Sequence, residues 1–546
     1  MKKTIITGAS ILALAAAAPA FAQSNVSTVD QNGNGNGATV EQVGSNMSDV
    51  DQDGDDNVAT VDQNGATNSS TIDQDSIGAG AFVTQDGSTN TSSITQNDGD
   101  DRNTIGLPED PEATVSQIGD RNTSTITQDA VAPGYNSIAN VDQMSDDNVS
   151  VIDQDIANTT STGGLQANVT QFGNSDSTVL QSVDAQHARQ LHATVIQTDS
   201  TSLVTQTASG PGAIGLVAEV TQFAGSDSTV SQTASGEDSG DLYASVMQDN
   251  GATSTITQTA AGLSSINQDA IVTQDGASNS MITQTFNGEG ANSFSATVNQ
   301  DGDANTSTVS QEDFTFTTVA NPDFGLTADV NQVGNGNMSS LTQVNKTQTA
   351  DVDQLGDGNM STGIQSGAAN SLTVLQTGTT NTSVITQEHT GNMSDVFQAG
   401  IGATSTIDQI GNAQNDMAFV DQLVGSDGSS STILQTGASG SPASANMADV
   451  TQSGLMNTSL ITQDGWNSDA TVLQSGANND SDITQTGTVA GAGNSADVTQ
   501  SGDWNVSDVL QTGSLNTATV TQSSDFNTSN VTQTGTGGTA TVTQGM

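Results

Sequence analysis

The chain has 546 residues, a formal net charge of −54, six lysines and arginines in total, and no cysteine. Its hydrophobic content of 32% and aromatic content of 3% are too low for several large globular cores, and the lack of cysteine excludes a disulfide framework. The strong negative charge disfavours a nucleic-acid partner, because both polymers are negative.

Residues 1–22 have the pattern of a secretory signal peptide. Two lysines form the basic start, an apolar stretch follows, and Ala-Phe-Ala at its end supplies a small-x-small cleavage site. The apolar stretch is too short to span a membrane as a helix. We therefore expect an exported protein whose mature chain begins at Gln23, with a short N-terminal segment over 23–28 before the repeats.

Residues 29–546 repeat one short unit, in which valine or isoleucine stands two residues before glutamine. The next such pair begins about eleven residues later. Residues 59–68, Ala-Thr-Val-Asp-Gln-Asn-Gly-Ala-Thr-Asn, show the whole unit. Its first five side chains alternate with the period of a strand that has one buried face. Each unit therefore predicts one short strand followed by one turn.

Three sets of positions in the unit have predicted structural roles. The branched residue is expected to form a buried core ladder: Val61, Ile72, Val352, Val374, Ile385, Val396, Ile407, Val520, Val531 and Val542. The glutamine is expected to form an amide ladder with its copies above and below: Gln63, Gln74, Gln354, Gln376, Gln387, Gln398, Gln409, Gln522, Gln533 and Gln544. Glycine two after glutamine and asparagine five after it are expected to adopt left-handed or tight turn conformations: Gly65, Asn68, Gly356, Asn359, Gly378, Asn381, Gly513 and Asn516.

The spacing of the glutamines predicts how the strands are wound. Between Gln96 and Gln258, long gaps of 15–21 residues alternate with short gaps of 9–11 residues. Because alternate turns of a two-strand rung lie at the same edge, this pattern indicates long loops mainly at one edge. With Gln268 treated as off-register the alternation continues, and the gap from Gln422 to Gln435 is the exception.

The predicted fold class is all-β, a β-solenoid of stacked strand-turn-strand rungs over residues 29–546. Rungs of about 22 to 27 residues give about 42 strands in about 21 rungs. Disorder is the alternative for a chain this charged and poor in apolar residues. The fixed spacing argues against it, because a disordered chain has no reason to hold valine or isoleucine two residues before glutamine.

The unit Ser/Ala-x-Val/Ile-x-Gln-x-Gly-x-x-Asn, the signal peptide and the Gly-, Ser-, Gln- and Asn-rich composition resemble the curlin repeat of bacterial curli subunits. The resemblance covers Val29 to Gln544, an unusual length for this family. It implies a secreted structural subunit of extracellular, cell-surface amyloid fibres of a Gram-negative bacterium, serving adhesion and biofilm. It also implies passage through an outer-membrane secretion channel, and partners that are other copies of the chain or related curlin subunits.

The ends of the repeat array suggest self-association. The last unit, residues 540–544, runs straight into the final two residues, and the first begins seven residues after the expected cleavage site. A solenoid with uncovered end strands exposes unpaired backbone groups. We therefore expect rungs of neighbouring molecules to stack into cross-β fibres. A monomeric or cell-attached β-solenoid adhesin, with the long-loop edge as its binding surface, is the alternative.

Acidic side chains are spread over outward positions, as in Asp49, Asp51, Asp53, Asp55 and Asp56. They are expected to keep the chain soluble until export. Divalent-cation binding between rungs is the other interpretation, because carboxylates stacked about 4.8 Å apart repel one another. This stretch resembles a calcium loop but lacks the later glutamate, so we assign no metal ligand.

No set of residues points to an enzyme. His187 and His192 flank Arg189 in one predicted long loop as solvated side chains, and no catalytic triad, phosphate loop or zinc spacing is convincing. We assign no catalytic or cofactor-binding residue and expect no cofactor. Thr-x-Thr pairs such as Thr255 and Thr257 resemble ice-binding rows, but threonine is also a good exposed strand former and other residues interrupt the rows.

Overall fold

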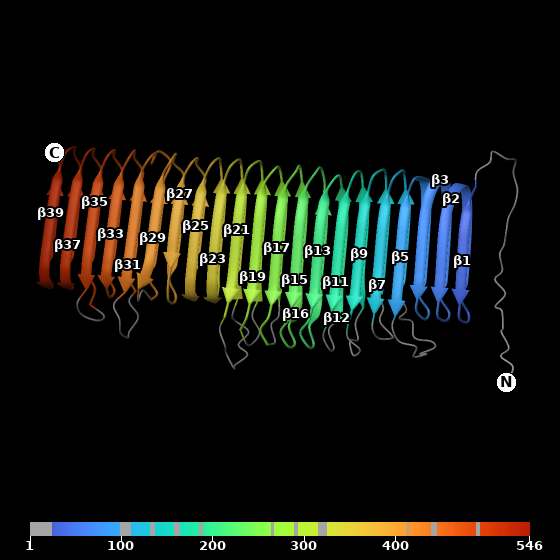
Figure 1. The fold of residues 1–546 in the computed structure, drawn as a ribbon. Coiled ribbons are helices and arrows are strands. Elements are labelled where there is room, and N and C mark those ends of the chain that lie inside the picture. Colours follow the sequence, from blue (N-terminus) through green and yellow to red (C-terminus); the bar gives the residue numbers. More distant parts are fainter. Residues whose placement is uncertain are drawn as a thin grey trace, which may run out of the picture. The chain divides into compact units, whose positions relative to one another are not determined.

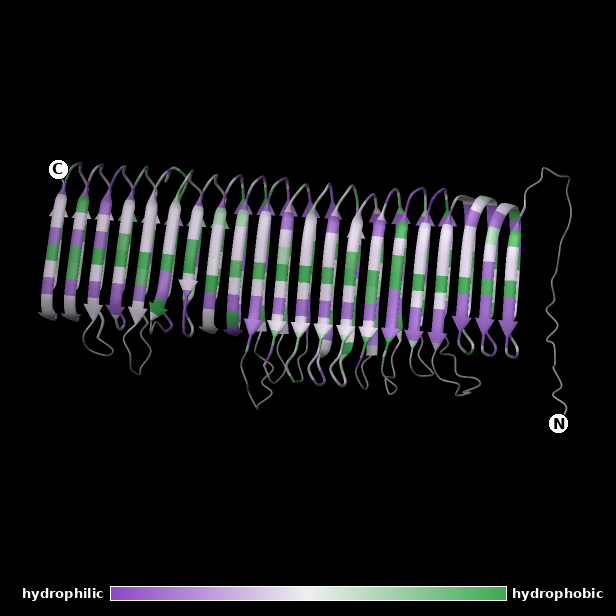
Figure 2. Ribbon diagram, in the orientation of Figure 1, coloured by the Kyte–Doolittle hydropathy of each residue, from purple (hydrophilic) through white to green (hydrophobic). Residues whose placement is uncertain are grey.

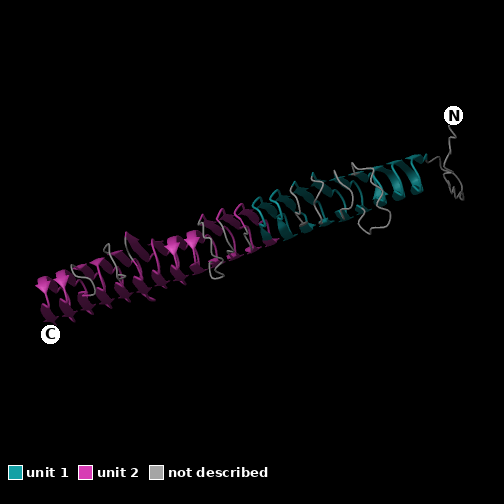
Figure 3. Ribbon diagram, turned by 90° about the horizontal axis from the view of Figure 1, so that it is seen from below, with its two compact units in different colours: residues 1–241 teal, residues 242–546 magenta. Residues whose placement is uncertain are grey.

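The chain divides into two compact units, residues 1–241 and residues 242–546, which Figure 3 shows in different colours. The signal peptide predicted for residues 1–22 lies outside the described residues. In the part of the chain that the structure describes, no helix has the length and apolar character needed to cross a membrane. The structure is a computed structural model that describes residues 24–98, 111–130, 137–157, 164–184, 189–263, 267–288, 293–314, 325–411, 414–437, 445–487 and 492–545.

The described residues of both units are strands joined by turns, which confirms the predicted all-β class. The strands of unit 1 are β1 (Val26–Asn32), β2 (Gly37–Asp53), β3 (Val58–Asp75), β4 (Gly80–Ser88), β5 (Thr91–Asp98), β6 (Glu112–Ile118), β7 (Thr123–Ala130), β8 (Ser137–Met144), β9 (Val149–Ile156), β10 (Leu165–Phe172), β11 (Asp176–Val183), β12 (Arg189–Thr198), β13 (Thr201–Ala208), β14 (Ile214–Gln222) and β15 (Asp227–Ala234).

Unit 2 has the same kind of element throughout, and its first strand starts two residues before the unit boundary. Its strands are β16 (Gly240–Asp249), β17 (Thr253–Ala260), β18 (Gln268–Asp275), β19 (Asn279–Phe286), β20 (Ser293–Asp301), β21 (Thr306–Asp313), β22 (Gly325–Val333), β23 (Met338–Lys346), β24 (Gln348–Leu355), β25 (Met360–Ala368), β26 (Ser371–Gln376), β27 (Thr382–Gln387), β28 (Met393–Gln398), β29 (Thr404–Gly411), β30 (Met417–Gln422), β31 (Ser430–Gly437), β32 (Met447–Gln452), β33 (Thr458–Gly465), β34 (Asp469–Gln474), β35 (Asp480–Gly487), β36 (Ser495–Gln500), β37 (Val506–Ser514), β38 (Thr517–Gln522), β39 (Thr528–Thr536) and β40 (Thr539–Gln544).

Within each unit the strands form two parallel ladders. From β4 onward a strand pairs with its second neighbour along the chain, so odd-numbered strands form one ladder and even-numbered strands the other (Figure 1). The register places glutamine on glutamine, as Gln96 on Gln128 between β5 and β7, and Gln500 on Gln522 between β36 and β38. A β-solenoid with two strands per rung is therefore the fold of each unit.

Strands β2 and β3 each run on through a turn and carry two consecutive repeat units, and they pair along both. For this reason the described residues contain 40 strands rather than the 42 expected, and the number of rungs differs slightly from the predicted 21. The first strand begins at Val26, three residues before the expected start of the repeats.

The connections differ between the two edges of a rung. Those that follow odd-numbered strands from β5 onward range from one residue, at 347, to the thirteen residues 99–111. Those that follow even-numbered strands from β4 onward range from two residues, at 89–90, to the seven residues 423–429. Gln268, which the glutamine spacing leaves off-register, is the buried first residue of β18 and pairs in register with Phe294.

The core of each unit is a thin layer between the two ladders. Along each strand buried residues alternate with part-exposed ones, as in β27, where Ser383, Ile385 and Gln387 are buried. Figure 2 shows the apolar residues of each unit as a band that crosses its successive strands. Each buried branched side chain contributes about 1.5–3 kcal/mol, so repetition compensates for the low apolar content.

Candidate functional site: the stacked polar ladders

The buried glutamines of each ladder form continuous chains of side-chain hydrogen bonds. In unit 2, Gln354 Nε2 donates to Gln376 Oε1 at 2.8 Å, and Gln376 Nε2 donates to Gln398 Oε1 at 2.7 Å. Gln376 Nε2 also donates to the backbone oxygen of Met360 in the other ladder at 3.0 Å. Both N–H groups and the carbonyl of this buried amide are thereby satisfied, which is the condition for burying an amide without a large penalty.

The glutamine chains have a direction. In unit 1, Gln52 donates to Gln74 at 2.8 Å, and Gln63 donates to Gln85 at 2.7 Å, so the rung earlier in the sequence supplies the donor, as in unit 2. Each rung therefore presents amide donors to the rung that follows and amide acceptors to the rung that precedes. Such chains of aligned hydrogen bonds reinforce one another in a low-dielectric interior.

Most of the predicted ladder residues lie in the buried layer. Val542 of β40 is half-buried, and the other nine branched residues predicted for the core ladder are at most 5% exposed. Gln533 and Gln544 are half-buried, and the other eight glutamines predicted for the amide ladder are fully buried. The pattern of the repeat unit thus identified residues that share one face of each strand.

The predicted turn glycines lie where neighbouring rungs approach most closely. Gly65, Gly356 and Gly513 have φ angles of 121°, 143° and 119°, in the region that favours glycine. A Cβ on these three residues would lie 1.8, 2.1 and 1.9 Å from the backbone oxygen of the glycine stacked on each in the next rung. At Gly378, where φ is not in this region, a Cβ would still lie 1.9 Å from the backbone oxygen of Gly400. Glycine is therefore required here by contact as well as by conformation.

The turn asparagines do not adopt the left-handed conformation, which was one of the two alternatives predicted for them. Asn68, Asn359, Asn381 and Asn516 have no positive φ, and all four are buried; the left-handed residue is the preceding one, such as Thr380 with φ 55°. Asn359 Oδ1 accepts the backbone N–H of Asn381 at 3.0 Å, and Asn359 Nδ2 donates to the backbone oxygen of Gly378 at 3.0 Å.

The asparagines therefore form a second amide ladder inside the turns. The left-handed residue reverses the chain and directs the next side chain inward, which local turn preferences alone do not reveal.

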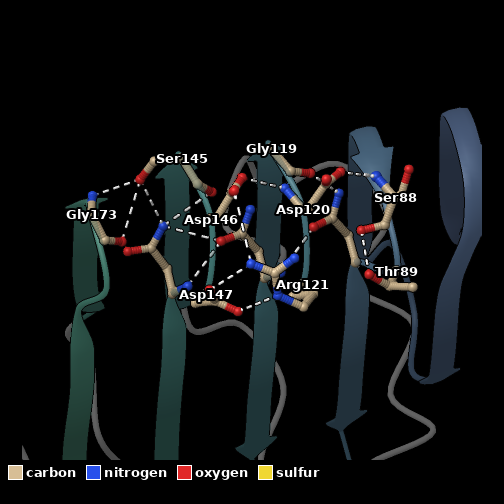
Figure 4. A network of polar contacts seen from close by, with 12 residues as sticks. Ser88, Thr89, Gly119, Asp120, Arg121, Ser145, Asp146, Asp147 and Gly173 are labelled. Atoms are coloured by element: carbon tan, nitrogen blue, oxygen red, sulfur yellow. Dashed lines mark hydrogen bonds and ion pairs between the residues drawn. The ribbon is translucent and has the colours of Figure 1, made fainter.

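Carboxylates in the short turns of unit 1 form a further ladder with backbone N–H groups (Figure 4). Asp120 Oδ1 accepts the backbone N–H of Ser88 at 2.7 Å, and Asp146 Oδ1 accepts the backbone N–H of Asp120 at 2.8 Å. Beside them, Arg121 Nε and Nη2 donate to Asp147 Oδ1 and Oδ2 at 2.6 and 2.7 Å. The sequence analysis treated the acidic residues as solvated and did not predict this role. The sequence pattern that marks it is an acidic or amide residue three positions after glutamine.

Other carboxylates stack on the outer faces of the strands. In unit 2, Asp329 and Asp351 are register partners in β22 and β24; Asp351 is exposed, and partial desolvation of its carboxyl by the neighbouring strands raises its pKa, which neighbouring carboxylates raise further. In unit 1, Asp51 is also exposed; partial desolvation raises its pKa, and the charges of its register partners Asp73 and Asp30 raise it further. Among the described residues, no three His, Cys, Asp or Glu side chains are grouped so as to hold a metal ion.

These pKa shifts predict that Asp351→Asn stabilises unit 2 at neutral pH. A carboxyl whose pKa is raised by folding binds its proton more tightly in the folded state. Wild-type stability should therefore rise as pH falls from neutrality through the raised pKa toward the ordinary value of 3.8. The Asp351→Asn variant should not show this rise in stability. Urea unfolding midpoints of both proteins, measured across this pH range, test the prediction.

Asp147→Asn is the control with the opposite sign, because the Arg121 guanidinium lowers the pKa of Asp147. Removing that carboxylate should lower the stability of unit 1 at neutral pH. Destabilisation by Asp351→Asn at pH 7 would contradict the assignment.

The small buried residue four positions before glutamine differs between the two ladders. The sequence analysis treated the alanines and serines at this position as one class and did not use the difference. From β5 onward every odd-numbered strand has serine there, as Ser405 in β29. From β4 onward every even-numbered strand has alanine, as Ala418 in β30, except for Leu372 in β26 and Ser394 in β28. The alternation of serine and alanine along the chain would have predicted two-strand rungs independently of the gaps.

Two buried serines provide a matched pair of substitutions. Ser394 Oγ donates to Gln409 Oε1 at 2.9 Å and accepts from Gln387 Nε2 at 3.1 Å, whereas Ser405 Oγ is buried without a hydrogen-bond partner. We expect Ser394→Ala to cost about 0.5–1.5 kcal/mol, and Ser405→Ala to be neutral or stabilising. Hydrogen exchange of the amides in β27 to β29 measures both, and a larger loss in Ser405→Ala would contradict the prediction.

The histidines and basic residues form no catalytic constellation in the described part of the chain. The loop position predicted for His192 was wrong, because it lies in β12, where Nδ1 contacts Gln166 Oε1 and Nε2 contacts Thr194 Oγ1, both at 3.0 Å. Arg189 is the first residue of the same strand, and His187 lies outside the described residues.

The two outward threonine rows of β17 differ. Thr255 and Thr257 lie on the outer face of β17, and Thr255 stacks on Met281, so its row is interrupted. Thr257 stacks on Thr283, which stacks on Ser310, so this second row keeps its hydroxyl groups over these rungs.

The curlin associated repeat matches the chain at two places, residues 45–75 and residues 491–523. The first match covers the second half of β2 and all of β3 in unit 1, and the second covers β36, β37 and β38 in unit 2. A comparison with curated proteins found no match. The curlin-repeat family is structural and non-enzymatic, and the repeat matches together with the β-solenoid fold fit a curli-like structural protein. The chain thus carries curlin associated repeats in both of its units, as expected of a member of the curlin-repeat family.

Proposed function

We propose that the chain is a structural subunit of extracellular curli-like amyloid fibres, which grow by in-register stacking of rungs from neighbouring copies. The supporting observation is the direction of the glutamine ladders: each rung offers Nε2 donors on one side and Oε1 acceptors on the other. A surface of this kind is complementary to a second copy of itself. Copies should therefore add head to tail, with donors meeting acceptors.

Pairing between copies would extend three interactions at once: the backbone ladder, the branched core and the glutamine chain. Val542 and Gln544 of β40 are half-buried, and pairing would cover them, as Val520 and Gln522 are covered by β40. Each newly buried branched residue contributes about 1.5–3 kcal/mol, and each amide hydrogen bond about 0.5–1.5 kcal/mol. These gains recur at every added copy and favour growth at fibre ends.

The proposed fibres lie at the surface of a Gram-negative bacterium, where they serve adhesion and the biofilm matrix. The mature chain reaches them through an outer-membrane channel and assembles with copies of itself or with related curlin subunits. The curlin repeats support an extracellular location. The formal charge of −54 supports a chain that stays soluble before assembly, because like charges keep unassembled copies apart.

The proposal is tested on mature protein purified as a monomer and then incubated at high concentration. We expect thioflavin-positive fibres in electron micrographs and a meridional reflection near about 4.7 Å from aligned material. Val542→Asp places a charge on the inward row and should block growth, whereas Thr543→Asp places the same charge on the outer face and should permit it. Protein that remains monomeric for days would exclude the fibre and favour a monomeric adhesin.

A further inference from the structure

Three methionines stack on the outer face of the even-numbered ladder in unit 2. Met393, the first residue of β28, is the register partner of Met417 in β30, which is the register partner of Met447 in β32. Met393 is 41% exposed, and the other two are half-buried. The fibre proposal does not use this row, and at the same strand position other even-numbered strands carry Ser371 and Thr517.

We propose that this methionine row binds a soft monovalent cation of the Cu(I) class through its thioether sulfur atoms. Thioethers are soft ligands that favour Cu(I) over calcium, magnesium or manganese. Neighbouring strands lie about 4.8 Å apart. Methionines on neighbouring strands in register can therefore hold one cation between two thioether sulfur atoms. Met417 has a methionine on either side, so it takes part in both possible bridges.

Carboxylates beside the row supply the negative charge that neutral thioethers lack. Asp395 and Asp449 stand two residues after Met393 and Met447 and therefore lie on the same strand faces. Asp469 continues the row as the register partner of Met447, and its Oδ1 atom is excluded from solvent without a hydrogen-bond partner. A partly desolvated carboxylate of this kind is stabilised by a nearby cation.

A second pair of stacked methionines serves as the internal comparison. Met338 and Met360 are register partners in β23 and β25, but the residues two positions on are Ser340 and Thr362 rather than aspartates. The register pairing is of the same kind, and the residues two positions on carry no carboxylate. This pair should therefore bind the same cation more weakly than the three-methionine row.

The test uses monomeric mature protein and Ag(I), a redox-stable probe with the ligand preferences of Cu(I). Isothermal titration should show one tight site that excess Ca²⁺ does not displace, and X-ray absorption should show sulfur ligands. Met417→Leu keeps the side-chain volume and should weaken the tight site at least tenfold, whereas the double variant Met338→Leu/Met360→Leu should leave it unchanged. Asp469→Asn should weaken it several-fold.

Four results would overturn the proposal. They are an oxygen-only coordination shell, displacement by Ca²⁺, unaltered binding in Met417→Leu, and loss of the tight site in the Met338→Leu/Met360→Leu variant. Circular dichroism of each variant establishes that the fold is retained. Fibre formation by Met417→Leu is measured separately, so that failure of the metal site and failure of the fibre proposal are distinguished.

Discussion

Replacing Gly334 by alanine is expected to destabilise unit 2 by roughly 2–5 kcal/mol. Gly334 has φ 115°, and a Cβ there would lie 2.2 Å from the backbone oxygen of Gly356 and 3.0 Å from Asp357 Oδ1. Neither atom is free to move, because the Gly356 N–H donates to the Val333 oxygen at 2.9 Å and Asp357 Oδ1 accepts the Asn335 N–H at 2.8 Å. The added methyl group must therefore separate two rungs locally.

Gly336, in the same turn, provides the control. Its φ is 67°, and a Cβ would meet nothing within 4 Å. The equivalent position in other turns holds Thr380 with φ 55° and Met456 with φ 53°, so Gly336→Ala should cost only about 1 kcal/mol. Hydrogen exchange of the amides in β22 and β24 measures both variants, since a repeat protein can open locally. Equal losses of protection would contradict the role assigned to close approach.

Leu372→Ala is expected to cost about 2–5 kcal/mol, because it leaves a cavity in the core of unit 2. Leu372 stands where the other even-numbered strands from β4 onward have alanine, except for Ser394 in β28. Gly363 stands where the other odd-numbered strands from β5 onward have a branched residue. A Cβ on Gly363 would lie 2.8 Å from Leu372 Cδ1 and 2.7 Å from Leu341 Cδ2. The leucine therefore fills the volume that the glycine leaves.

A double-mutant cycle tests whether Leu372 and Gly363 compensate for each other in volume or contribute independently to the free energy of unfolding. Gly363→Val alone should cost about 1–3 kcal/mol through overpacking. The double variant Gly363→Val/Leu372→Ala restores the pattern of neighbouring rungs and should cost far less than the sum of the single changes. Leu372→Met, which keeps the volume, should cost less than about 1.5 kcal/mol. Urea unfolding of the monomer supplies the free energies, and additive losses would show that the two residues are not coupled.

Much of the fold could be predicted because each repeat unit obeys one local rule. Alternating side chains fix which face of a strand is buried, and this rule alone assigns Val352 and Gln354 to the core, where both are buried. Alternate gap lengths predicted two-strand rungs, since an insertion at one edge leaves the strand register unchanged. The sequence analysis treated the serines and alanines four positions before glutamine as one class, although their alternation along the chain also predicts two-strand rungs.

The turns show where local reasoning fails. In the turns after Gln376, Gln452 and Gln500 the left-handed residue is the fourth after glutamine, namely Thr380, Met456 and Trp504. Trp504 has φ 59° with 55% of its surface exposed. Its backbone N–H donates to the oxygen of Ala477 in the preceding turn at 2.9 Å. Hydrogen bonds between stacked turns hold this conformation against the residue's own preference, so residue type does not reveal it.

The sequence by itself determined the all-β class, the strand positions and the identity of the buried valine and glutamine rows, because these depend on a period within one chain segment. The tertiary structure alone decided the direction of the amide chains, the inward turn asparagines and the meeting of three methionines, of which Met393 and Met447 are 54 residues apart (447 − 393). These features depend on which units stack on one another, since stacking brings distant residues within about 4.8 Å.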